Sequence, residues 1–197
     1  MYETHEGLER LMTYYRCAIM EIETKFRVLN EEYSLQHDRN PINSMKSRLK
    51  KIQSISEKLE RKQLPKTLEA IEEHLKDVAG IRIVCAFEED VYELADALLK
   101  QDDITLIEKK DYIKCPKENG YRSLHLIVAV PIFLETEKVE IQLRTIAMDC
   151  WASLEHQLRY KKSNVFTEEM QKQLQCCAEL SKELDARMDY LRKQADI

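Results

Sequence analysis

Seven cations lie between residues 46 and 62, and their types and spacing suit a site for a polyphosphate. They are Lys46, Arg48, Lys50, Lys51, Lys58, Arg61 and Lys62, opposed within the segment by Glu57 and Glu60. If the second half of this segment is helical, Ser54, Lys58 and Arg61 lie on one face, because residues three and four apart are neighbours on a helix. Arg48 and Lys50 then precede the helix N-terminus, which itself favours phosphate. A solvated basic helix face is the alternative interpretation.

Two acids, Asp77 and Glu140, are the candidates for metal-assisted chemistry. Apolar and polar residues alternate strictly over residues 139–144, which predicts a strand with Glu140, Gln142 and Arg144 on one face. Asp77 stands where a helix gives way to a strand, a position that suits a Mg²⁺ ligand or a plain turn residue. A single polar strand face is ordinarily a solvent face, whereas two acids beside a phosphate binder indicate metal-assisted phosphoryl chemistry.

An Asn119–Gly120 turn precedes a strand and places Tyr121 at its start, where the ring is free to stack on a base. His125 follows four residues later and therefore lies on the same side of the strand. A packing tyrosine and a hydrogen-bonded histidine are the alternative. Trp151, by contrast, sits among apolar residues at helical spacing, which predicts a core side chain.

The composition narrows the class of protein. Of the 197 residues, 44% are hydrophobic and 34% charged, with only 3 Gly and 4 Pro, which excludes a disordered or collagen-like chain and favours long helices. No apolar run approaches the roughly 18 residues of a membrane span, and residues 1–6 lack the profile of a signal peptide, so we expect a cytoplasmic protein without a membrane partner. The net charge is −5 although residues 46–62 carry +5, a distribution that suits a small polyphosphate better than DNA. The six cysteines have no paired spacing and are expected to be free thiols rather than zinc ligands.

The elements that position these residues follow from the hydrophobic periodicity. Helices are expected over residues 5–33, 67–76, 89–100, 145–161 and 167–194, with a weakly helical stretch at 56–60, and strands over 81–87, 104–108, 123–133 and 138–144. Residues 38–41 end the first helix because Pro41 and its predecessor leave helical geometry, and Thr145 is expected to cap the helix that follows the last strand. The pattern predicts an α+β fold, a mixed sheet of about four or five strands with packed helices and a long helix at each end.

Each terminal helix carries an apolar stripe. Leu8, Leu11, Tyr15, Ile19, Ile22, Phe26, Leu29 and Tyr33 form the first, and Met170, Leu174, Cys177, Leu184, Met188 and Leu191 the second. Because apolar faces need cover, we expect a homo-oligomer built on one or both helices; packing of the two helices against each other is the alternative. One domain is expected over residues 1–197, with an N-terminal helix over 1–38, a catalytic core over 40–162 and a C-terminal helix over 165–197.

Four segments, taken in order, resemble the (p)ppGpp synthetase domains of the RelA/SpoT family. They are the R-x-K-x-x-x-S-x-x-x-K spacing of residues 48–58, Asp77-Val-Ala-Gly-Ile-Arg82, Asn119-Gly-Tyr-Arg-Ser-Leu-His125 and Val139-Glu-Ile-Gln-Leu-Arg-Thr145. The resemblance covers roughly residues 40–162 and indicates a small, stand-alone alarmone synthetase. It implies a nucleotidyltransferase-like fold and transfer of the β,γ-pyrophosphate of ATP to the 3′-hydroxyl of GTP or GDP, which releases AMP.

The resemblance also implies roles by matched position. ATP is implied to be held by Arg48, Lys50, Ser54, Lys58, Arg61 and Arg82, with Arg48 and Arg82 flanking adenine. The acceptor GTP or GDP is implied to be surrounded by Lys110, Lys117, Tyr121, His125, Arg144 and Asp149, with Tyr121 stacked on guanine. Asp77 and Glu140 are implied to coordinate Mg²⁺, and Glu140 also to accept the proton of the 3′-hydroxyl. Family members of this size are tetramers, which is the assembly we expect.

Three observations qualify the resemblance. Family members often have Asn where this chain has Asp149, which changes the charge beside the acceptor. The segment 131–139 between the last two strands is short. Longer members place a hydrolase domain with a His-Asp motif before the synthetase, and the one His-Asp pair here is His37–Asp38, so we expect synthesis without degradation. A catalytically silent nucleotide-binding regulator and a template-independent nucleotidyltransferase are the alternatives, and the carboxylate pair favours an enzyme over the first.

Overall fold

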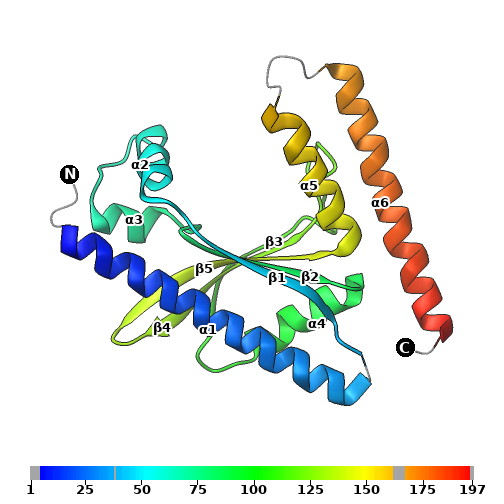
Figure 1. Cartoon of the computed structure of the whole chain (residues 1–197), viewed down its shortest axis with the longest axis horizontal. Coiled ribbons are helices and arrows are strands. Elements are labelled where there is room, and N and C mark those ends of the chain that lie inside the picture. Colours follow the sequence, from blue (N-terminus) through cyan, green and yellow to red (C-terminus); the bar gives the residue numbers. More distant parts are fainter. Residues whose placement is uncertain (1–4, 38, 162–166, 196–197) are drawn as a thin grey trace.

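A five-stranded mixed sheet runs through the centre of the computed structural model, which describes residues 5–37, 39–161 and 167–195 (Figure 1). The strands are β1 (Ile42–Leu49), β2 (Ala79–Cys85), β3 (Thr105–Asp111), β4 (Leu124–Ile132) and β5 (Glu135–Thr145). Their order is β1-β2-β5-β4-β3, with β2 and β5 parallel and the other neighbours antiparallel. The strands that carry Arg82 and Glu140 therefore lie side by side in the middle of the sheet.

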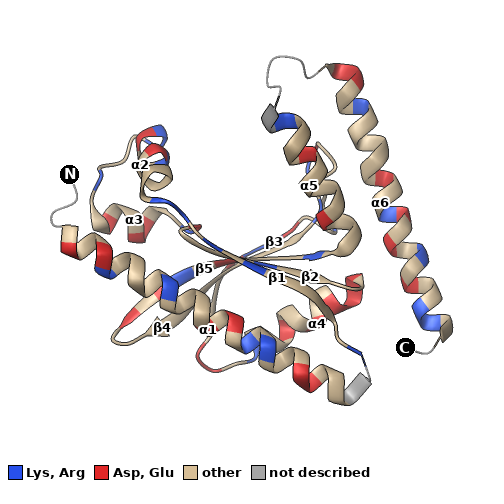
Figure 2. Cartoon of the chain, viewed as in Figure 1, with Lys and Arg blue, Asp and Glu red and all other residues tan. Residues whose placement is uncertain are grey.

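The helices divide between the two faces of the sheet. α1 (His5–His37) and α4 (Glu88–Leu99) lie on one face, whereas α2 (Ile52–Arg61) and α5 (Ile146–Lys161) stand on the other, with α3 (Leu68–His74) beside α2 and α6 (Glu168–Ala195) beside α5 (Figure 1). Figure 2 shows Lys and Arg along the middle of the sheet, between α2 and α5. The expected α+β architecture with a long helix at each end is confirmed. None of the helices in the described ranges is long and apolar enough to span a membrane.

The apolar stripe of α1 closes the core against the sheet. Tyr15, Ile22 and Phe26 are at most 1% exposed, and each buried side chain of this size contributes roughly 1.5–3 kcal/mol relative to an exposed one. They pack in one cluster with the inward residues of the strands, among them Ile83, Leu126, Val128, Ile141 and Leu143. The stripe predicted for α1 is confirmed, and this chain's own sheet covers it.

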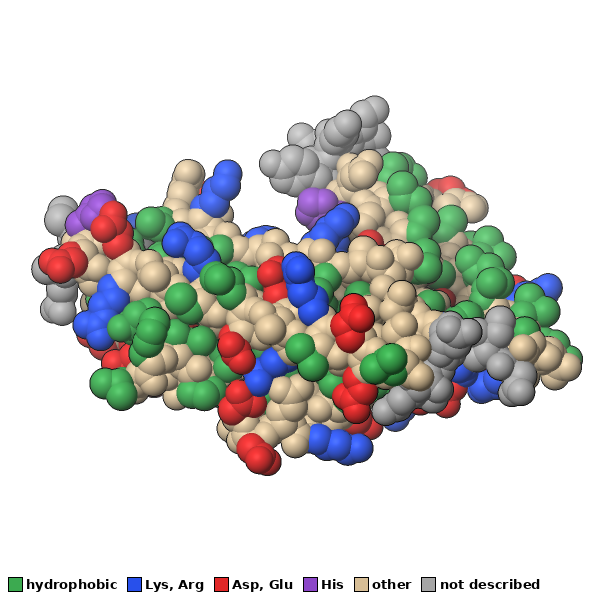
Figure 3. All heavy atoms as spheres, turned by 60° about the horizontal axis from the view of Figure 1, so that its bottom comes forward, with side chains coloured by type: hydrophobic (Ala, Val, Ile, Leu, Met, Phe, Trp, Pro, Cys, Tyr) green, Lys and Arg blue, Asp and Glu red, His purple; other side chains and the backbone are tan. Residues whose placement is uncertain are grey.

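The stripe predicted for α6 is left largely uncovered by the rest of the chain, because of its six members Leu174 alone is buried. The residues that α6 turns inward are mostly polar and recur at helical spacing: Gln171, Leu174, Ala178, Ser181, Asp185, Asp189 and Arg192. Met170, Leu180, Leu184, Met188 and Leu191 are 38% to 64% exposed, and Figure 3 shows hydrophobic side chains along this side of the molecule, at the right of the view. Mostly polar residues of α6 thus face the rest of the chain, and its apolar stripe faces away from it. The alternative of α1 packing on α6 also fails, since α6 packs on α5.

β1 has no counterpart among the strands expected from the sequence. It is an edge strand paired only with β2, in the register Lys46 to Arg82 and Arg48 to Gly80. Edge strands tolerate charged residues, so the apolar alternation that marks a central strand is missing. Arg48 therefore lies on a strand, and α2 begins at Ile52, directly after the Lys50 position that we expected to precede a helix.

The other boundaries differ from expectation by a few residues, and two details are confirmed. The Met148 backbone N–H donates to Thr145 Oγ1 at 3.1 Å, so Thr145 caps α5 as predicted. Trp151 is buried, also as predicted, and its indole N–H donates to the Leu174 carbonyl of α6 at 3.0 Å. Asp38 and residues 162–166, where the sequence predicted boundaries between the helices and the core, lie outside the described residues.

Candidate functional site

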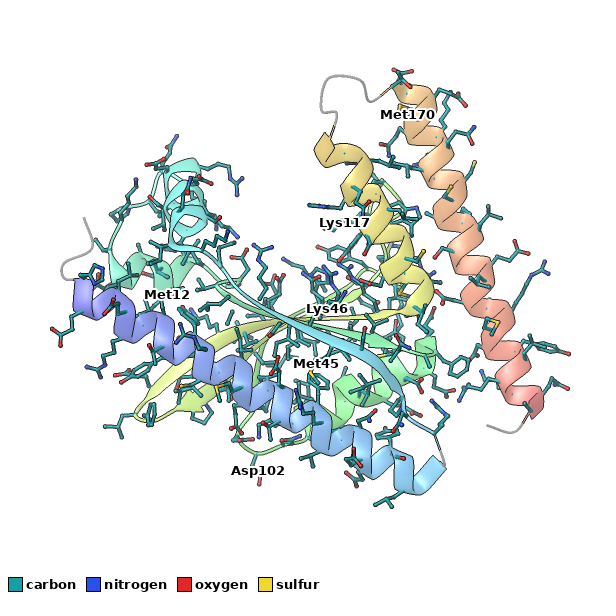
Figure 4. All side chains as sticks on the ribbon, in the orientation of Figure 1. Met12, Met45, Lys46, Asp102, Lys117 and Met170 are labelled. Atoms are coloured by element: carbon teal, nitrogen blue, oxygen red, sulfur yellow. The ribbon has the colours of Figure 1, made fainter. Side chains whose placement is uncertain are left out.

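Two cavities of similar size open on the face of the sheet between α2 and α5, and they meet at Asp77 and Glu140. The first, called the β1 cavity, has a volume of about 430 Å³ and is lined by Lys46, Ser47, Arg48, Gly80, Ile81, Arg82 and Gln142 in addition to the two acids. The second, called the β3 cavity, has a volume of about 440 Å³ and is lined by Lys58, Lys62, His74, Lys76, Glu108, Lys110, Tyr112, Lys117, His125 and Ile127 in addition to the same acids. Figure 4 labels Lys46 on β1 and Lys117 near α5 on this side of the sheet.

Strand register explains why the two acids share this position. Glu140 on β5 lies beside Gly80 on β2 and Ile127 on β4, and Gln142 lies beside Arg82 and His125. Because side chains alternate along a strand, these polar groups emerge on the same face of three hydrogen-bonded strands. Asp77 precedes β2 and reaches the same place from the loop after α3.

Two lysines hold Asp77 in its ionised form. Lys50 Nζ and Lys58 Nζ lie 2.5 Å and 2.7 Å from Asp77 Oδ2. Burial raises the pKa of Asp77, but the hydrogen bonds from Lys50 and Lys58 outweigh it and bring the pKa below its usual value. The other oxygen, Oδ1, is buried and accepts no hydrogen bond from the described residues. Asp77 therefore keeps one free, charged oxygen beside both cavities.

Glu140 is also ionised, for a different reason. Burial raises its pKa, and the negative charge of Asp77 raises it further, but the interaction with His125 outweighs both and the net pKa lies below the usual value. His125 Nδ1 is 3.6 Å from Glu140 Oε1, and Gln142 Nε2 donates to Oε2 at 3.3 Å. A carboxylate that keeps its charge while three-quarters covered is suited to accept a proton or to bind a cation.

A hydrogen-bonded network joins Tyr121 to the acids. Arg144 Nη2 donates to Tyr121 Oη at 2.6 Å, and Tyr121 Oη lies 2.8 Å from His125 Nε2. If the tyrosine hydroxyl donates to Nε2, the remaining imidazole N–H is at Nδ1 and points at Glu140. Arg144 also donates to Gln142 Oε1 at 2.8 Å. The network orients the Tyr121 ring relative to Glu140.

Cations lie against the aromatic rings of Tyr112, which lines the β3 cavity, and of Tyr121, which contacts its lining residue His125. Lys117 Nζ is 4.6 Å from the ring centroid of Tyr112 and 4.8 Å from that of Tyr121, and the Arg144 guanidinium carbon is 5.0 Å from the Tyr121 centroid. Tyr112 also packs edge-on against His125. Such rings offer stacking surfaces for a planar base.

Asp149 links Arg82, which lines the β1 cavity, to Arg144, which contacts Tyr121 and Gln142. Its Oδ1 lies 3.3 Å from Arg82 Nη1 and 3.2 Å from Arg144 Nη1. Burial and the nearby charge of Arg144 lower the pKa of Arg82. The Nε groups of Arg82 and Arg144 are buried and find no hydrogen-bond partner among the described residues. One carboxylate thus holds a guanidinium that lines the β1 cavity and another that donates to Tyr121.

Most of the residues predicted from the sequence come together here. Arg48, Arg82, Asp77, Glu140, Lys58, Lys110, Lys117 and His125 line the cavities, and Lys50, Tyr121, Arg144 and Asp149 contact those that do. Ser54 and Arg61 lie on α2 but do not line either cavity.

The sequence reasoning missed several lining residues as site residues: Lys46, Lys62, His74, Lys76, Glu108, Tyr112 and Gln142. Lys46 and Lys62 belong to the basic segment, and Gln142 lies on the predicted polar strand face. Glu108, Lys110 and Tyr112 alternate along and just beyond β3, so period two was the signal that could have identified Glu108 and Tyr112. His74 ends the short helix α3 and Lys76 follows it, where no comparable pattern exists.

Asp77 and Glu140 are the residues that could hold a metal ion. No group of three or more His, Cys, Asp or Glu side chains able to hold a metal occurs in the described part of the chain. Mg²⁺ nevertheless needs only one or two carboxylates, because it retains water and binds the phosphates of its substrate. The unpartnered Asp77 Oδ1 and the ionised Glu140 fit that ligand set.

Comparison with known proteins agrees with the resemblance found in the sequence. Residues 47–165 match the family described as the region found in RelA / SpoT proteins. The chain is 44% identical over 186 residues to the GTP pyrophosphokinase YwaC of Bacillus subtilis, covering 92% of this chain and 89% of that protein. It is 39% identical over 188 residues to the GTP pyrophosphokinase YjbM of the same organism, covering 93% and 88%.

Solved structures agree over nearly the whole chain. The small alarmone synthetase 1 of Bacillus subtilis bound to its product pppGpp has a TM-score of 0.86 and 36% identity, covering 98% of this chain and 100% of that one. A GTP pyrophosphokinase family protein from Streptococcus pneumoniae has a TM-score of 0.85 and 36% identity, covering 98% and 96%. The similarity therefore includes the sheet and both long terminal helices.

Proposed function

The chain belongs to the RelA/SpoT family, and we propose that it is a GTP pyrophosphokinase that binds ATP in the β1 cavity and GTP or GDP in the β3 cavity. One observation carries the assignment of the cavities: they are separate, similar in volume and joined at two ionised acids. A transferase for two nucleotides needs two such sites with the reacting groups where they meet. As in the small alarmone synthetases that it resembles, we assign it synthesis without degradation.

The β1 cavity suits the donor because its side chains are cations on hydrogen-bonded strands. Arg48 on β1 and Arg82 on β2 present planar guanidiniums able to stack on adenine or to bind phosphate. Lys50 and Lys58 do not line this cavity, but both bind Asp77 where the two cavities meet, and so they place positive charge where the β- and γ-phosphates would lie. The resemblance adds Ser54 and Arg61 on α2 to this set.

The β3 cavity suits the acceptor because it combines rings with charge. Guanine stacked on Tyr121 would displace Lys117, whose side chain is the more exposed of the two cations beside that ring. Lys110, Lys117, His125 and Arg144 would then surround the sugar and phosphates, with Asp149 behind Arg144.

Glu140 is the proposed base. It removes the proton from the 3′-hydroxyl as that oxygen attacks the β-phosphorus of ATP; the new O–P bond forms, the bond to the α–β bridging oxygen breaks, and AMP leaves with that oxygen. Asp77 and Glu140 are the residues that would hold Mg²⁺, which when bound neutralises charge on the transferring phosphates. Positioning and charge neutralisation supply most of the rate in such transfers, and the cations listed by cavity above provide both.

Product analysis tests this function. The protein is incubated with ATP, GDP or GTP, and Mg²⁺, and the products are separated by anion exchange. We expect one AMP for each guanine nucleotide that gains two phosphates. Release of ADP or pyrophosphate as the stoichiometric product would contradict it, and nucleotide binding without turnover would make the chain a silent regulator.

We also propose that the protein is a cytoplasmic homo-oligomer, most simply a tetramer like the family members of its size. The exposed stripe of α6 supports assembly, and exposed apolar residues of α5, Ile146, Leu154 and Leu158, add to the apolar surface. The proposed substrates, ATP and GTP, support the cytoplasmic location. Light scattering at micromolar concentration should give a multiple of 23.4 kDa, and a monomer would contradict assembly.

A further inference from the structure

The loop that carries Tyr121 is shaped by its own hydrogen bonds, but other elements of the fold determine its position. Residues 116–122, called the Tyr121 loop, connect β3 to β4 outside regular secondary structure. The Gly120 N–H donates to the Lys117 carbonyl at 2.8 Å, and the Lys117 N–H donates to the Tyr121 carbonyl at 3.1 Å. These bonds set the shape of the turn, whereas contacts with other elements set its position over the β3 cavity. One of them joins the loop to α5, where Asn119 Nδ2 donates to Glu155 Oε1 at 3.3 Å.

α6 contacts the loop directly before Tyr121. Gly120 has φ +88°, and a Cβ on it would lie 2.5 Å from the Cβ of Ala178, so the loop backbone rests on the surface of α6. Ala178 is 4% exposed. Gln175, one turn earlier on α6, donates from Nε2 to the Glu118 carbonyl at 2.8 Å. The contact needs a small residue on both sides.

α6 also holds the residue directly after Tyr121. Arg122 is buried, and its guanidinium donates to Asp185 Oδ2 of α6 at 3.0 Å and to Glu88 Oε2 of α4 at 2.8 Å. α6 is itself fixed on α5 by the bond from the Trp151 indole N–H to the Leu174 carbonyl. Both neighbours of Tyr121 are thus attached to one helix, which begins after residue 165, where the matched family region ends.

We propose that α6 is the positioning element of the acceptor site: through Gly120, Glu118 and Arg122 it sets the place of the Tyr121 ring and thereby the affinity for the guanine nucleotide. Neither cavity has a lining residue on α6, but the Tyr121 loop contributes Lys117 to the β3 cavity and no residue to the β1 cavity, so α6 acts on the acceptor and not on the donor. This inference rests on the proposed role of Tyr121 in binding guanine.

Ala178→Leu tests the proposal, because the larger side chain pushes against Gly120 while leucine keeps a high helix propensity. We expect the KM for GDP to rise several-fold, with about 150-fold, the full effect of losing a stacked base, as the limit. The KM for ATP and kcat at saturating GDP should stay within about twofold, because only the acceptor ring has moved. Ala195→Leu, the same change at an exposed position at the end of α6, is the matched control and should behave as wild type.

Gln175→Ala keeps the test valid if Ala178→Leu does not fold, because Gln175 is exposed and its loss costs one hydrogen bond to the loop. It should raise the KM for GDP in the same direction by a smaller factor. Fluorescence of Trp151, the one tryptophan, reports whether α6 remains docked. An unchanged KM for GDP in both variants, or equal rises for GDP and ATP, would overturn the proposal. If wild type makes no product, the proposed function fails, and direct GDP binding to the same variants still decides the role of α6.

Discussion

The β1 and β3 cavities are nearly equal in volume and share Asp77 and Glu140, yet different elements of the fold supply their other lining residues. The strands β1, β2 and β5 supply most of the β1 cavity, so hydrogen-bonded backbone fixes its cations. The β3 cavity takes its rings and charges from α2, α3, β3, β4 and a loop that contacts α6. The difference indicates that a rigid sheet presents the donor phosphates, whereas tertiary contacts far along the chain set the selection of the acceptor base.

Glu140→Gln removes the charge at the boundary of the two cavities and should have the largest effect. Glutamine keeps the size of the side chain but accepts no proton and binds Mg²⁺ poorly. A general base typically contributes about 10²–10⁴-fold, so kcat should fall at least 100-fold. Steady-state kinetics on a variant with an unchanged circular dichroism spectrum provides the measurement. A folded variant with more than about a tenth of wild-type kcat would exclude Glu140 as the base.

Tyr121→Ala should weaken nucleotide binding in one cavity and leave binding in the other nearly unchanged. Stacking of a base on an aromatic ring is worth roughly 1–3 kcal/mol, so affinity for GDP should fall about 5- to 150-fold with little change for ATP. Tyr121→Phe keeps the ring and removes the hydroxyl that contacts Arg144 and His125, so it should retain most of the affinity. Calorimetric titration of each nucleotide measures both. Equal losses for GDP and ATP would indicate a folding role for the ring.

Asp149→Asn should change both cavities at once, because its carboxylate contacts Arg82 on one side and Arg144 on the other. Loss of the negative charge frees two guanidiniums for anionic substrates, and a partly exposed ion pair is worth at most about 1 kcal/mol. KM for ATP and for GDP should therefore both fall, by up to about fivefold. A change for one nucleotide alone would show that Asp149 does not link the cavities.

Glu137→Gln should leave turnover unchanged and alter stability instead. Glu137 lies three residues before Glu140 and hence on the opposite face of β5, where it is 3% exposed. Burial, with the charges of Glu72 and Glu135, raises its pKa from 4.5 to about 7. The folded state therefore binds this proton more tightly than the unfolded state, so the contribution of Glu137 to stability is greatest below pH 4.5 and is lost as the pH rises through about 7.

Glutamine mimics the protonated form, so the variant should gain up to about 3 kcal/mol at pH 8 and little at pH 5. Urea unfolding of wild type and variant at the two pH values provides the comparison. An equal gain at both pH values would point to packing rather than titration.

Local patterns in the sequence predicted the centre of the site, and long-range contacts account for what they did not predict. Strict alternation over residues 139–144 was enough to place Glu140 and Arg144 on one face, because a strand has a fixed period. β1 escaped prediction because an edge strand needs no apolar alternation. Ser54 and Arg61 were expected at ATP from a matched motif, and neither lines the two cavities.

The terminal helices show most clearly what hydrophobic periodicity does not predict. α1 and α6 carry stripes with the same spacing, but one is buried under the sheet and the other is exposed. Spacing determines which residues share a face of a helix and not what that face packs against. The inward face of α6 is set by pairs such as Arg122 with Asp185, which are 63 residues apart and leave no local pattern.

The most direct test of two separate nucleotide sites is calorimetric titration of the Glu140→Gln protein, which should bind substrates without consuming them. A non-hydrolysable ATP analogue and GDP are each titrated into the free protein and into protein already saturated with the other nucleotide. Separate donor and acceptor cavities predict one-to-one binding of each nucleotide in both titrations. Loss of GDP binding once the ATP analogue is bound, with the affinity recovered as the analogue is diluted out, would show one shared site and contradict the assignment.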